Sequence, residues 1–225
     1  CPVLVLTMTW PIPTQMNRMV HNQHVTFPPR FNLKSLSSYA VKPGWVLRSL
    51  ARMPFKFGNF EAHWPGEAGL TRVIEQLDPS TNWKDVEWVR SIWPGKLLIK
   101  GIMTPEDARL AIDAGVDGIS VSNHGGNMLD ATTSTISALP GVLEAVDERA
   151  EVLLDGGVRS GQDVLRALAL GAQGCLIGRA HLYGAAAAGK AGVSKALEII
   201  HTELSITAGL AGLPDITKVS GEILA

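Results

Sequence analysis

The sequence predicts an α/β protein whose parallel strands form a (β/α) barrel. Five short apolar segments are typical of strands that are buried on both faces. From the second strand onward, helical segments alternate with strands through short connections, which favours a parallel sheet covered by helices. Glycines and polar residues follow directly after several strands. Because barrels collect their functional groups at that rim, this pattern favours a barrel over an open sheet.

The expected elements follow one another in a regular order. The strands are Val3–Met8, Lys96–Lys100, Gly118–Ser122, Glu151–Asp155 and Gly174–Gly178. The helices are expected at about 83–93, 105–114, 133–146, 161–171 and 190–209. Thr104 precedes a proline, and Asn82 and Ser160 each stand three residues before an aspartate, so all three are expected to cap helices. A complete barrel has eight strands and typically about 250 residues, so the chain looks like the second half or more of one.

Residues 10–82 interrupt this order. The segment is rich in proline and separates the first strand from the second. One helix is expected at about 44–52. Long connections in compact domains are usually lids, binding loops or disordered insertions, and the segment is compatible with a lid or with a disordered insertion.

The composition excludes several classes of protein. A net charge of -1 gives no support for nucleic-acid binding. No apolar run approaches the roughly 18 residues of a membrane span, and the apolar start lacks the basic residues of a signal peptide. Cys1 and Cys175 form neither a disulfide framework nor a metal-binding spacing, so we expect no metal site and a cytoplasmic location.

His124 is the first candidate catalytic residue. It follows the expected strand Gly118–Ser122 and precedes Gly125 and Gly126, which allow a ligand or another backbone to approach closely. A neutral imidazole at the end of a buried strand can accept a proton from a substrate. A lone histidine is more often structural, so the surrounding pattern is what favours a catalytic role.

Two neighbouring strand ends predict a phosphate site. Gly156, Gly157 and Arg159 follow one strand, and Gly178 and Arg179 follow the next. Glycines expose backbone N–H groups, a helix start adds a positive dipole end, and arginines pair with phosphate oxygens. The alternative is that the arginines form surface ion pairs and the glycines only turn the chain.

Six motifs together resemble the FMN-dependent α-hydroxy acid dehydrogenase and oxidase family, which includes glycolate oxidase, L-lactate dehydrogenase and mandelate dehydrogenase. They are Leu-Ile-Lys-Gly-Ile (98–102), Ser-Asn-His-Gly-Gly (122–126), Leu-Asp (129–130), Leu-Asp-Gly-Gly-Val-Arg-Ser-Gly (154–161), Ala-Leu-Ala-Leu-Gly-Ala (167–172) and Ile-Gly-Arg (177–179). The resemblance implies a TIM (β/α)8 barrel that binds FMN. Residues 1–225 would be the C-terminal part of one such domain, covering about strands four to eight, with an insertion at about 10–82.

The resemblance also implies roles for individual residues. His124 would take the substrate proton as hydride passes to the flavin, and Lys100 would stabilise the reduced flavin ring. The alternative for Lys100 is a buried ion pair. The implied cofactor contacts are Thr7, Lys100, Ser122, His124, Gly125, Asp155, Gly157, Arg159, Gly178 and Arg179. The implied protein is an oxidoreductase acting on a small-molecule substrate, and family members are commonly homotetramers.

Three positions depart from the family pattern, and each lacks the usual charge. Thr9 replaces an aspartate that partners the histidine, Asn127 replaces an arginine that clamps the substrate carboxylate, and Met16 replaces another active-site arginine. An asparagine cannot supply a charged bidentate fork. We therefore expect an α-hydroxy acid or a less charged alcohol or amine as substrate. The asparagine variant also resembles the flavoproteins of mycofactocin maturation, which oxidise a modified peptide fragment.

Two other interpretations remain open at this point. One is a weakened or silent family member, or a fragment, that still binds FMN. The other is a phosphate-binding barrel without flavin, such as a synthase or an isomerase.

Overall fold

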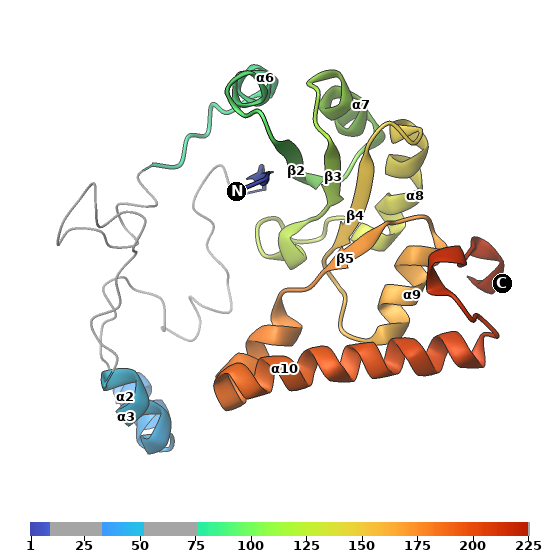
Figure 1. The fold of residues 1–225 in the computed structure, drawn as a ribbon. Coiled ribbons are helices and arrows are strands. Elements are labelled where there is room, and N and C mark those ends of the chain that lie inside the picture. The colour runs from blue at the N-terminus through green and yellow to red at the C-terminus, as the bar shows by residue number, and fades with distance from the viewer. Residues whose placement is uncertain (10–32, 52–75, 225) are drawn as a thin grey trace. The chain divides into compact units, whose positions relative to one another are not determined.

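The computed structural model describes residues 1–9, 33–51 and 76–224 (Figure 1). The chain divides into two compact units. One consists of Cys1–Thr9 and Thr81–Ala225, and the other of Trp10–Ser80. Each unit is described by itself.

The first unit is built on a five-stranded parallel sheet in which the strands lie in chain order. The strands are β1 (Val3–Thr7), β2 (Lys96–Ile102), β3 (Gly118–Val121), β4 (Glu151–Asp155) and β5 (Gly174–Leu176). All five expected strands are present, and the prediction of a parallel α/β fold is confirmed. Because every strand runs the same way, the carboxyl ends of β1 to β5 meet at one rim, where the predicted site residues lie.

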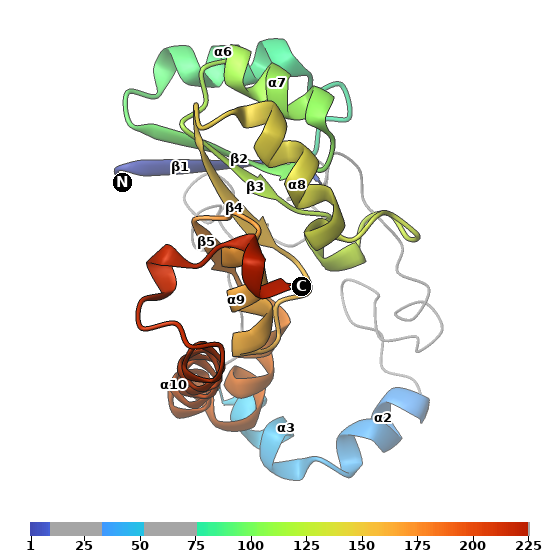
Figure 2. The same ribbon diagram turned by 90° about the vertical axis from the view of Figure 1, so that its right-hand side faces the viewer.

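Helices follow the strands. They are α6 (Trp83–Ile92), α7 (Pro105–Asp113), α8 (Thr135–Val146), α9 (Gly161–Ala169) and α10 (Arg179–Leu210), followed by two short 3-10 helices, η2 (Ile216–Lys218) and η3 (Gly221–Leu224). The side chains of Asn82, Thr104 and Ser160 accept backbone N–H groups as N-caps, as expected. Figure 2 shows α6 and α7 together over one face of the sheet. None of the helices in the described ranges combines the length and apolar character of a membrane-spanning segment.

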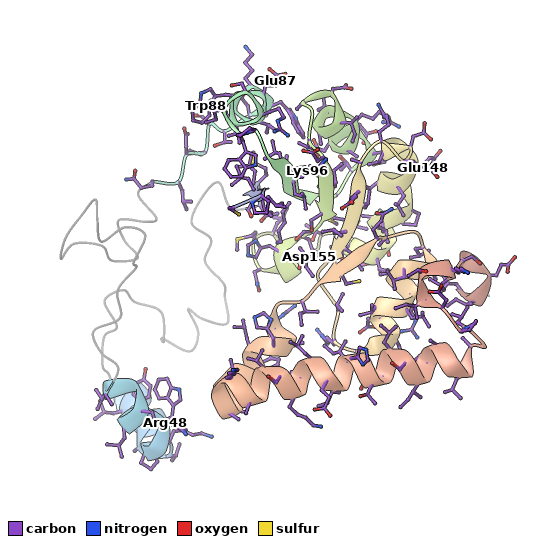
Figure 3. All side chains as sticks on the ribbon, in the orientation of Figure 1. Arg48, Glu87, Trp88, Lys96, Glu148 and Asp155 are labelled. Atoms are coloured by element: carbon purple, nitrogen blue, oxygen red, sulfur yellow. The ribbon has the colours of Figure 1, made fainter. Side chains whose placement is uncertain are left out.

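The core lies between the helices and one face of the sheet. Alternate residues of each strand point to opposite faces. In β2, Leu97 and Ile99 are fully buried, whereas Leu98 and Lys100 are only partly so. The buried face comprises Leu97, Ile99, Ile119, Val121, Val152 and Leu154, and the helices contribute Val86, Ala108, Leu139, Val142 and Ala167. The opposite face carries the polar groups of the site, and Figure 3 shows Asp155 on the sheet while Glu87 and Trp88 lie on the outer side of α6.

Helix α10 begins earlier than the sequence predicts. The expected helix spans about 190–209, but α10 starts at Arg179. Ala188 and Gly189 have non-helical backbone angles, so the helix breaks there and its second part begins where the expected helix does. The small residues between 184 and 190 give no amphipathic pattern, which explains why the first part is absent from the prediction.

The described residues of the second unit include two short helices, α2 (Leu33–Ala40) and α3 (Pro43–Leu50). Tyr39 and Trp45 stack across the turn between them, with ring centroids 5.9 Å apart and planes within 6°. α3 matches the helix expected at about 44–52, whereas α2 was not expected. Whether residues 10–82 act as a lid stays a prediction, and Met16 lies outside the described residues.

Gly161 sets the packing of α9 against α10. A Cβ at this position would lie 1.9 Å from the backbone nitrogen of Leu204 and 2.6 Å from the carbonyl oxygen of Ile200. We expect Gly161→Ala to lower the free energy of unfolding by about 1–3 kcal/mol or more, because the two backbones must separate. Gly209 on α10 has no atom within 4 Å of its Cβ position, so Gly209→Ala is the matched control and should not destabilise the protein. Urea denaturation of both variants measures this, and equal midpoints would contradict the packing argument.

Candidate active site

A largely buried polar cluster joins the ends of β2, β3 and β4. The Lys100 ammonium lies 2.8 Å from Asp155 Oδ2 and donates to Ser122 Oγ at 3.1 Å. The Ser122 hydroxyl donates to the same carboxylate oxygen at 2.6 Å and is fully buried. The side chains of Lys100 and Asp155 are 17% and 14% exposed. The ion pair that the sequence left open for Lys100 is therefore present, and it fixes a positive charge at the rim.

The loop after β3 presents His124 in a strained conformation. His124, Gly125 and Gly126 all have positive φ, at 55°, 69° and 73°. They form a short 3-10 turn, η1 (His124–Gly126). The left-handed region costs a non-glycine residue about 1–2 kcal/mol, so the surroundings must stabilise it. The backbone N–H of His124 donates to Ser122 Oγ at 3.1 Å, and the N–H of Gly126 donates to Asn123 Oδ1 at 3.2 Å.

The imidazole of His124 has a defined partner. Its Nδ1 lies 2.7 Å from Thr9 Oγ1, two residues beyond the end of β1. Partial burial and then the nearby Lys100 ammonium lower the pKa of His124 below its usual 6.5, while Asp155 acts in the opposite direction. The lowered pKa favours the neutral imidazole, which is the state that accepts a proton.

A cavity of about 300 Å³ lies beside this loop. It is bordered by Gly125 and Gly126, by the turn after β4 with Gly157, and by Arg179 at the start of α10. The Arg179 guanidinium also donates to the carbonyl oxygen of Gly125 at 3.1 Å. The cavity thus connects the histidine loop with the predicted phosphate site.

The two helix starts at this cavity differ in their availability to an anion. At α9, the Asp163 carboxylate accepts the N–H groups of Arg159 and Ser160, and Glu203 accepts the N–H of Gly161 at 2.9 Å. At α10, the N-cap Gly178 provides no side-chain hydrogen bond. The backbone N–H groups at the start of α9 therefore already bind carboxylates of the protein. The start of α10 is the one at which no side chain caps the helix.

The residues of the predicted phosphate site, here called the cradle, fit a phosphate-bearing cofactor. The cradle consists of Gly157, Arg159, Gly178 and Arg179. Cβ positions at Gly157 and Gly178 meet no atom within 4 Å, so the backbone there is open to a ligand. Arg179 borders the cavity and supplies a cation. The Arg159 side chain is exposed, and its guanidinium pairs with no other group among the described residues. A flavin nucleotide carries the terminal anion that these groups would accept.

The structure gathers most of the predicted site residues at one rim and gives them specific neighbours. Thr7 is exposed at the end of β1, in register with Lys100. Asn127 ends the turn that begins at His124, with its N–H 3.4 Å from the carbonyl oxygen of His124. Asp155, which the resemblance places against the flavin, contacts Lys100 and Ser122. The cofactor and substrate roles of these residues stay predictions.

Three further residues shape the site and were not singled out from the sequence. Asn123 holds the histidine turn through Gly126. Thr135 is 4% exposed and donates to the carbonyl oxygen of Gly156 at 3.1 Å. Gly101 interrupts the pairing of β2 with β3 and has φ +122°. Asn123 and Gly101 lie within motifs that carry the family resemblance, and Gly101 adds a structural signal, because an isolated glycine within a strand indicates a bulge.

No group of three or more metal-binding side chains gathers anywhere in the part of the chain that the structure describes. The site combines a histidine of lowered pKa, the Lys100–Asp155 ion pair and two turns with glycine and arginine at the ends of parallel strands. This combination is typical of cofactor-dependent enzymes built on α/β barrels.

Comparison with known proteins narrows this class. Residues 1–225 match the family model of FMN-dependent dehydrogenases. The chain is 42% identical over 227 residues to an L-lactate dehydrogenase of Caulobacter vibrioides, covering 99% of this chain and 59% of that protein. It is 40% identical over 229 residues to an L-lactate dehydrogenase of Ectopseudomonas mendocina, covering 100% of this chain and 60% of that protein.

Solved structures agree with this assignment. The structure of (S)-mandelate dehydrogenase, described as a monotopic membrane protein, matches with a TM-score of 0.92 and 35% identity. The match covers 99% of this chain and 59% of that one. A mandelate oxidase with (S)-4-hydroxymandelic acid is 45% identical, with a TM-score of 0.60, over 65% of this chain and 40% of that one.

The chain belongs to the FMN-dependent dehydrogenase family. The resemblance drawn from the six motifs, the TIM-barrel fold and FMN as the family's cofactor are thereby confirmed. The chain spans 59–60% of the length of the curated relatives it matches. The sheet described above is accordingly part of a barrel.

Proposed function

We propose that the protein containing this chain is an FMN-dependent oxidoreductase that oxidises an α-hydroxy acid or a related, less charged alcohol or amine. The observation that carries the proposal is geometric: His124, whose Nδ1 lies 2.7 Å from Thr9 Oγ1, is located at the same rim as the Lys100–Asp155 pair. The relatives named for lactate and mandelate support the substrate class. Thr9 and Asn127, in place of charged family residues, support its extension to less charged substrates.

Each group has a distinct task in this proposal. Bound FMN would supply a two-electron acceptor. His124 takes the proton of the substrate at Nε2, in the tautomer whose Nδ1–H donates to Thr9 Oγ1. The Lys100 ammonium, held by Asp155 and Ser122, stabilises negative charge that develops beside it.

The cradle holds and orients the cofactor. Gly157 and Gly178 leave its backbone accessible, and Arg159 and Arg179 supply cations for the terminal phosphate. Ser122, Gly125 and Thr7 belong to the same rim, and we assign them the flavin contacts that the family resemblance implies.

Anaerobic mixing of the purified full-length protein with a panel of substrates tests this function. The panel contains lactate, glycolate, mandelate, their amides and the corresponding alcohols and amines. Loss of the visible flavin absorbance on addition of one of them is the expected result. A colourless protein, or a yellow one that no member of the panel bleaches, would contradict the proposal. A silent FMN-binding member is not favoured, because the relatives are named as L-lactate dehydrogenases and an (S)-mandelate dehydrogenase.

Arg159→Ala should weaken flavin retention. The exposed guanidinium of Arg159 pairs with no group among the described residues. Its removal should therefore lower the affinity for the ligand and leave the stability of the fold unchanged. Loss of one charge-assisted phosphate contact, worth roughly 1.5–3 kcal/mol, corresponds to about a tenfold to hundredfold weaker binding. Titration of the apo-protein with FMN measures this. Arg109→Ala is the control, since Arg109 lies on α7 and only approaches Glu106 at 3.9 Å. Equal affinities of both variants would count against the cradle.

The rate of flavin reduction should have its acid limb below pH 6.5. Burial and Lys100 lower the pKa of His124 from 6.5, so the folded protein keeps the imidazole deprotonated to lower pH than a free histidine. The base is then fully available at pH 7 and is lost only as pH falls through the lowered pKa. A profile of kcat/KM between pH 4.5 and 9 would place this limb, with the range chosen to span about two units on either side of an ordinary histidine. An acid limb above pH 7 would contradict the argument.

We further propose a homotetramer in the cytoplasm. The family resemblance supports the oligomeric state, and the two unpaired cysteines, Cys1 and Cys175, suit a reducing compartment. Light scattering and cell fractionation of the full-length protein would test both.

A further inference from the structure

Arg179 contacts two parts of the site at once. It borders the cavity at the start of α10, as part of the cradle. Its Nη2 donates to the carbonyl oxygen of Gly125 at 3.1 Å, in the turn that presents His124. Arg179 and Gly125 are 54 positions apart in the chain, so the bond joins the start of α10 to the loop after β3. In the ranges that the structure describes, it is the one hydrogen bond of this guanidinium.

The turn that accepts this bond depends on its neighbours. His124, Gly125 and Gly126 all lie in the left-handed region, which is costly for a histidine. The hydrogen bond that closes the turn, from the N–H of Asn127 to the carbonyl oxygen of His124, is long at 3.4 Å. The Arg179 guanidinium holds the middle of the turn from the α10 side. It therefore helps to determine where His124 and Asn127 lie.

One guanidinium can bond to the turn and to a phosphate together. It carries five N–H donors in a planar fork, and the bond to Gly125 uses Nη2. Nη1 and Nε remain for the oxygens of an anion in the cavity. The side chain of Arg159, the other arginine of the cradle, forms no hydrogen bond to the turn among the described residues. Arg179 is therefore the cradle residue that connects the anion site with the turn.

Gly125 gives the guanidinium room to approach. A Cβ at Gly125 would lie 3.2 Å from Arg179 Nη2, so the guanidinium would have to shift. Gly126 has almost the same backbone conformation, with φ +73° against +69°, but its Cβ position meets no atom within 4 Å. The two glycines therefore carry the same backbone strain on substitution and differ in their contact with Arg179, which makes them a matched pair.

We propose that Arg179 is a positioning residue that joins the cofactor phosphate to the turn carrying His124 and Asn127, so that phosphate binding and ordering of the turn stabilise each other. The inference rests on the proposed function for the identity of the phosphate as that of FMN, whereas the bond to Gly125 is a property of the protein itself. Because coupling between two sites is reciprocal, whatever the phosphate does to the turn, the ordered turn does to phosphate affinity by the same factor.

Hydrogen exchange of the full-length protein freed of flavin tests the contact alone. In Arg179→Ala, we expect the amides of Gly126 and Asn127 to exchange about two- to tenfold faster than in the wild type, the usual effect of losing one hydrogen bond. Arg159→Ala removes the same charge from the cradle but no contact with the turn, so these amides should exchange at the wild-type rate. Equal rates in the wild type and Arg179→Ala would overturn the proposal, as would an equal acceleration in Arg159→Ala.

Riboflavin, which lacks the phosphate, is the matched control ligand. At saturating concentrations of each ligand, FMN should slow exchange of the wild-type turn about two- to tenfold more than riboflavin does. The difference should disappear in Arg179→Ala, because the phosphate is then no longer joined to the turn. Equal protection of the wild-type turn by the two ligands would show that the phosphate does not order it, and the proposal would be wrong.

The paired glycines test the coupling in the opposite direction. Gly125→Ala should weaken FMN binding about two- to tenfold more than Gly126→Ala, because it also displaces Arg179. In the Arg179→Ala background the two glycine variants should bind FMN equally. A difference that persists there would mean that Gly125 acts on the ligand directly, and no difference in either background would remove the coupling.

The two proposals fail differently. Exchange and FMN titration require no turnover. If no substrate reduces the flavin, the proposed function fails while exchange of the flavin-free protein still decides whether Arg179 orders the turn. If the flavin is reduced but Arg179→Ala exchanges as the wild type does, only the positioning role of Arg179 is wrong.

Discussion

His124→Gln should lower the rate of flavin reduction by about 10²–10⁴-fold at pH 7, the usual contribution of a positioned base. Glutamine retains hydrogen-bonding capacity and similar bulk but cannot take up a proton in this pH range. The effect should appear in kcat, because the substitution removes proton acceptance and leaves the Lys100–Asp155 pair intact. Anaerobic stopped-flow measurement with the best substrate of the panel gives the rate.

The flavin content of the variant must be compared as well. His201→Gln is the matched control, because His201 is exposed on α10 and its side chain makes no hydrogen bond within the described residues. It should keep the wild-type rate. A His124→Gln protein with normal flavin content and a rate within about threefold of wild type would exclude His124 as the base, since that change is far below the typical effect.

Asp155→Ala should lower the free energy of unfolding by about 3 kcal/mol. The substitution leaves the Lys100 ammonium, whose side chain is 17% exposed, without its counter-charge, and Ser122 loses the acceptor of its hydroxyl. Breaking one side of a buried pair typically costs about 3–5 kcal/mol, and the residual exposure of this pair places it at the lower end. Urea denaturation of the full-length apo-protein measures the loss.

The double variant Lys100→Met with Asp155→Leu should recover much of that stability. Removing both charges also removes the unpaired ammonium, so the double variant should be more stable than Asp155→Ala alone. Lys195→Met is the surface control, because Lys195 and Glu198 are each 64% exposed and such pairs contribute about 0.2–1 kcal/mol. If Asp155→Ala lowers the free energy of unfolding no more than Lys195→Met does, the Lys100–Asp155 pair behaves as a surface ion pair.

Local sequence signals account for most of the fold. The strands are predictable because short apolar runs are bounded by glycines and polar residues. The helix starts were visible because Asn82, Thr104 and Ser160 have side chains that accept N–H groups of the first turn. α2 is not predicted because three of its eight residues are serines, which are weaker helix formers, whereas α3, of equal length, begins with a proline.

The sequence predicts which residues of the site lie close together but not which of them form hydrogen bonds. A parallel sheet brings strand ends together, so Lys100, His124 and Asp155 could be placed at one rim from the sequence. Their bonds could not be predicted, because the contact of Ser122 with Asp155 depends on strand register and that of Thr9 with His124 also depends on the bulge at Gly101. Such contacts join residues 33 and 115 positions apart, beyond any local pattern.

The carboxylates of Asp163 and Glu203 affect where an anionic ligand can bind within the cradle. They neutralise the positive N-terminal end of α9, whereas no side chain caps the N-terminal end of α10 at Gly178. Within the proposed cradle, the terminal anion of the cofactor would therefore meet open backbone N–H groups at the start of α10, while Arg159 beside the α9 turn would contribute its side-chain charge. We therefore expect the nucleotide to bind in one orientation, with its terminal phosphate at the start of α10.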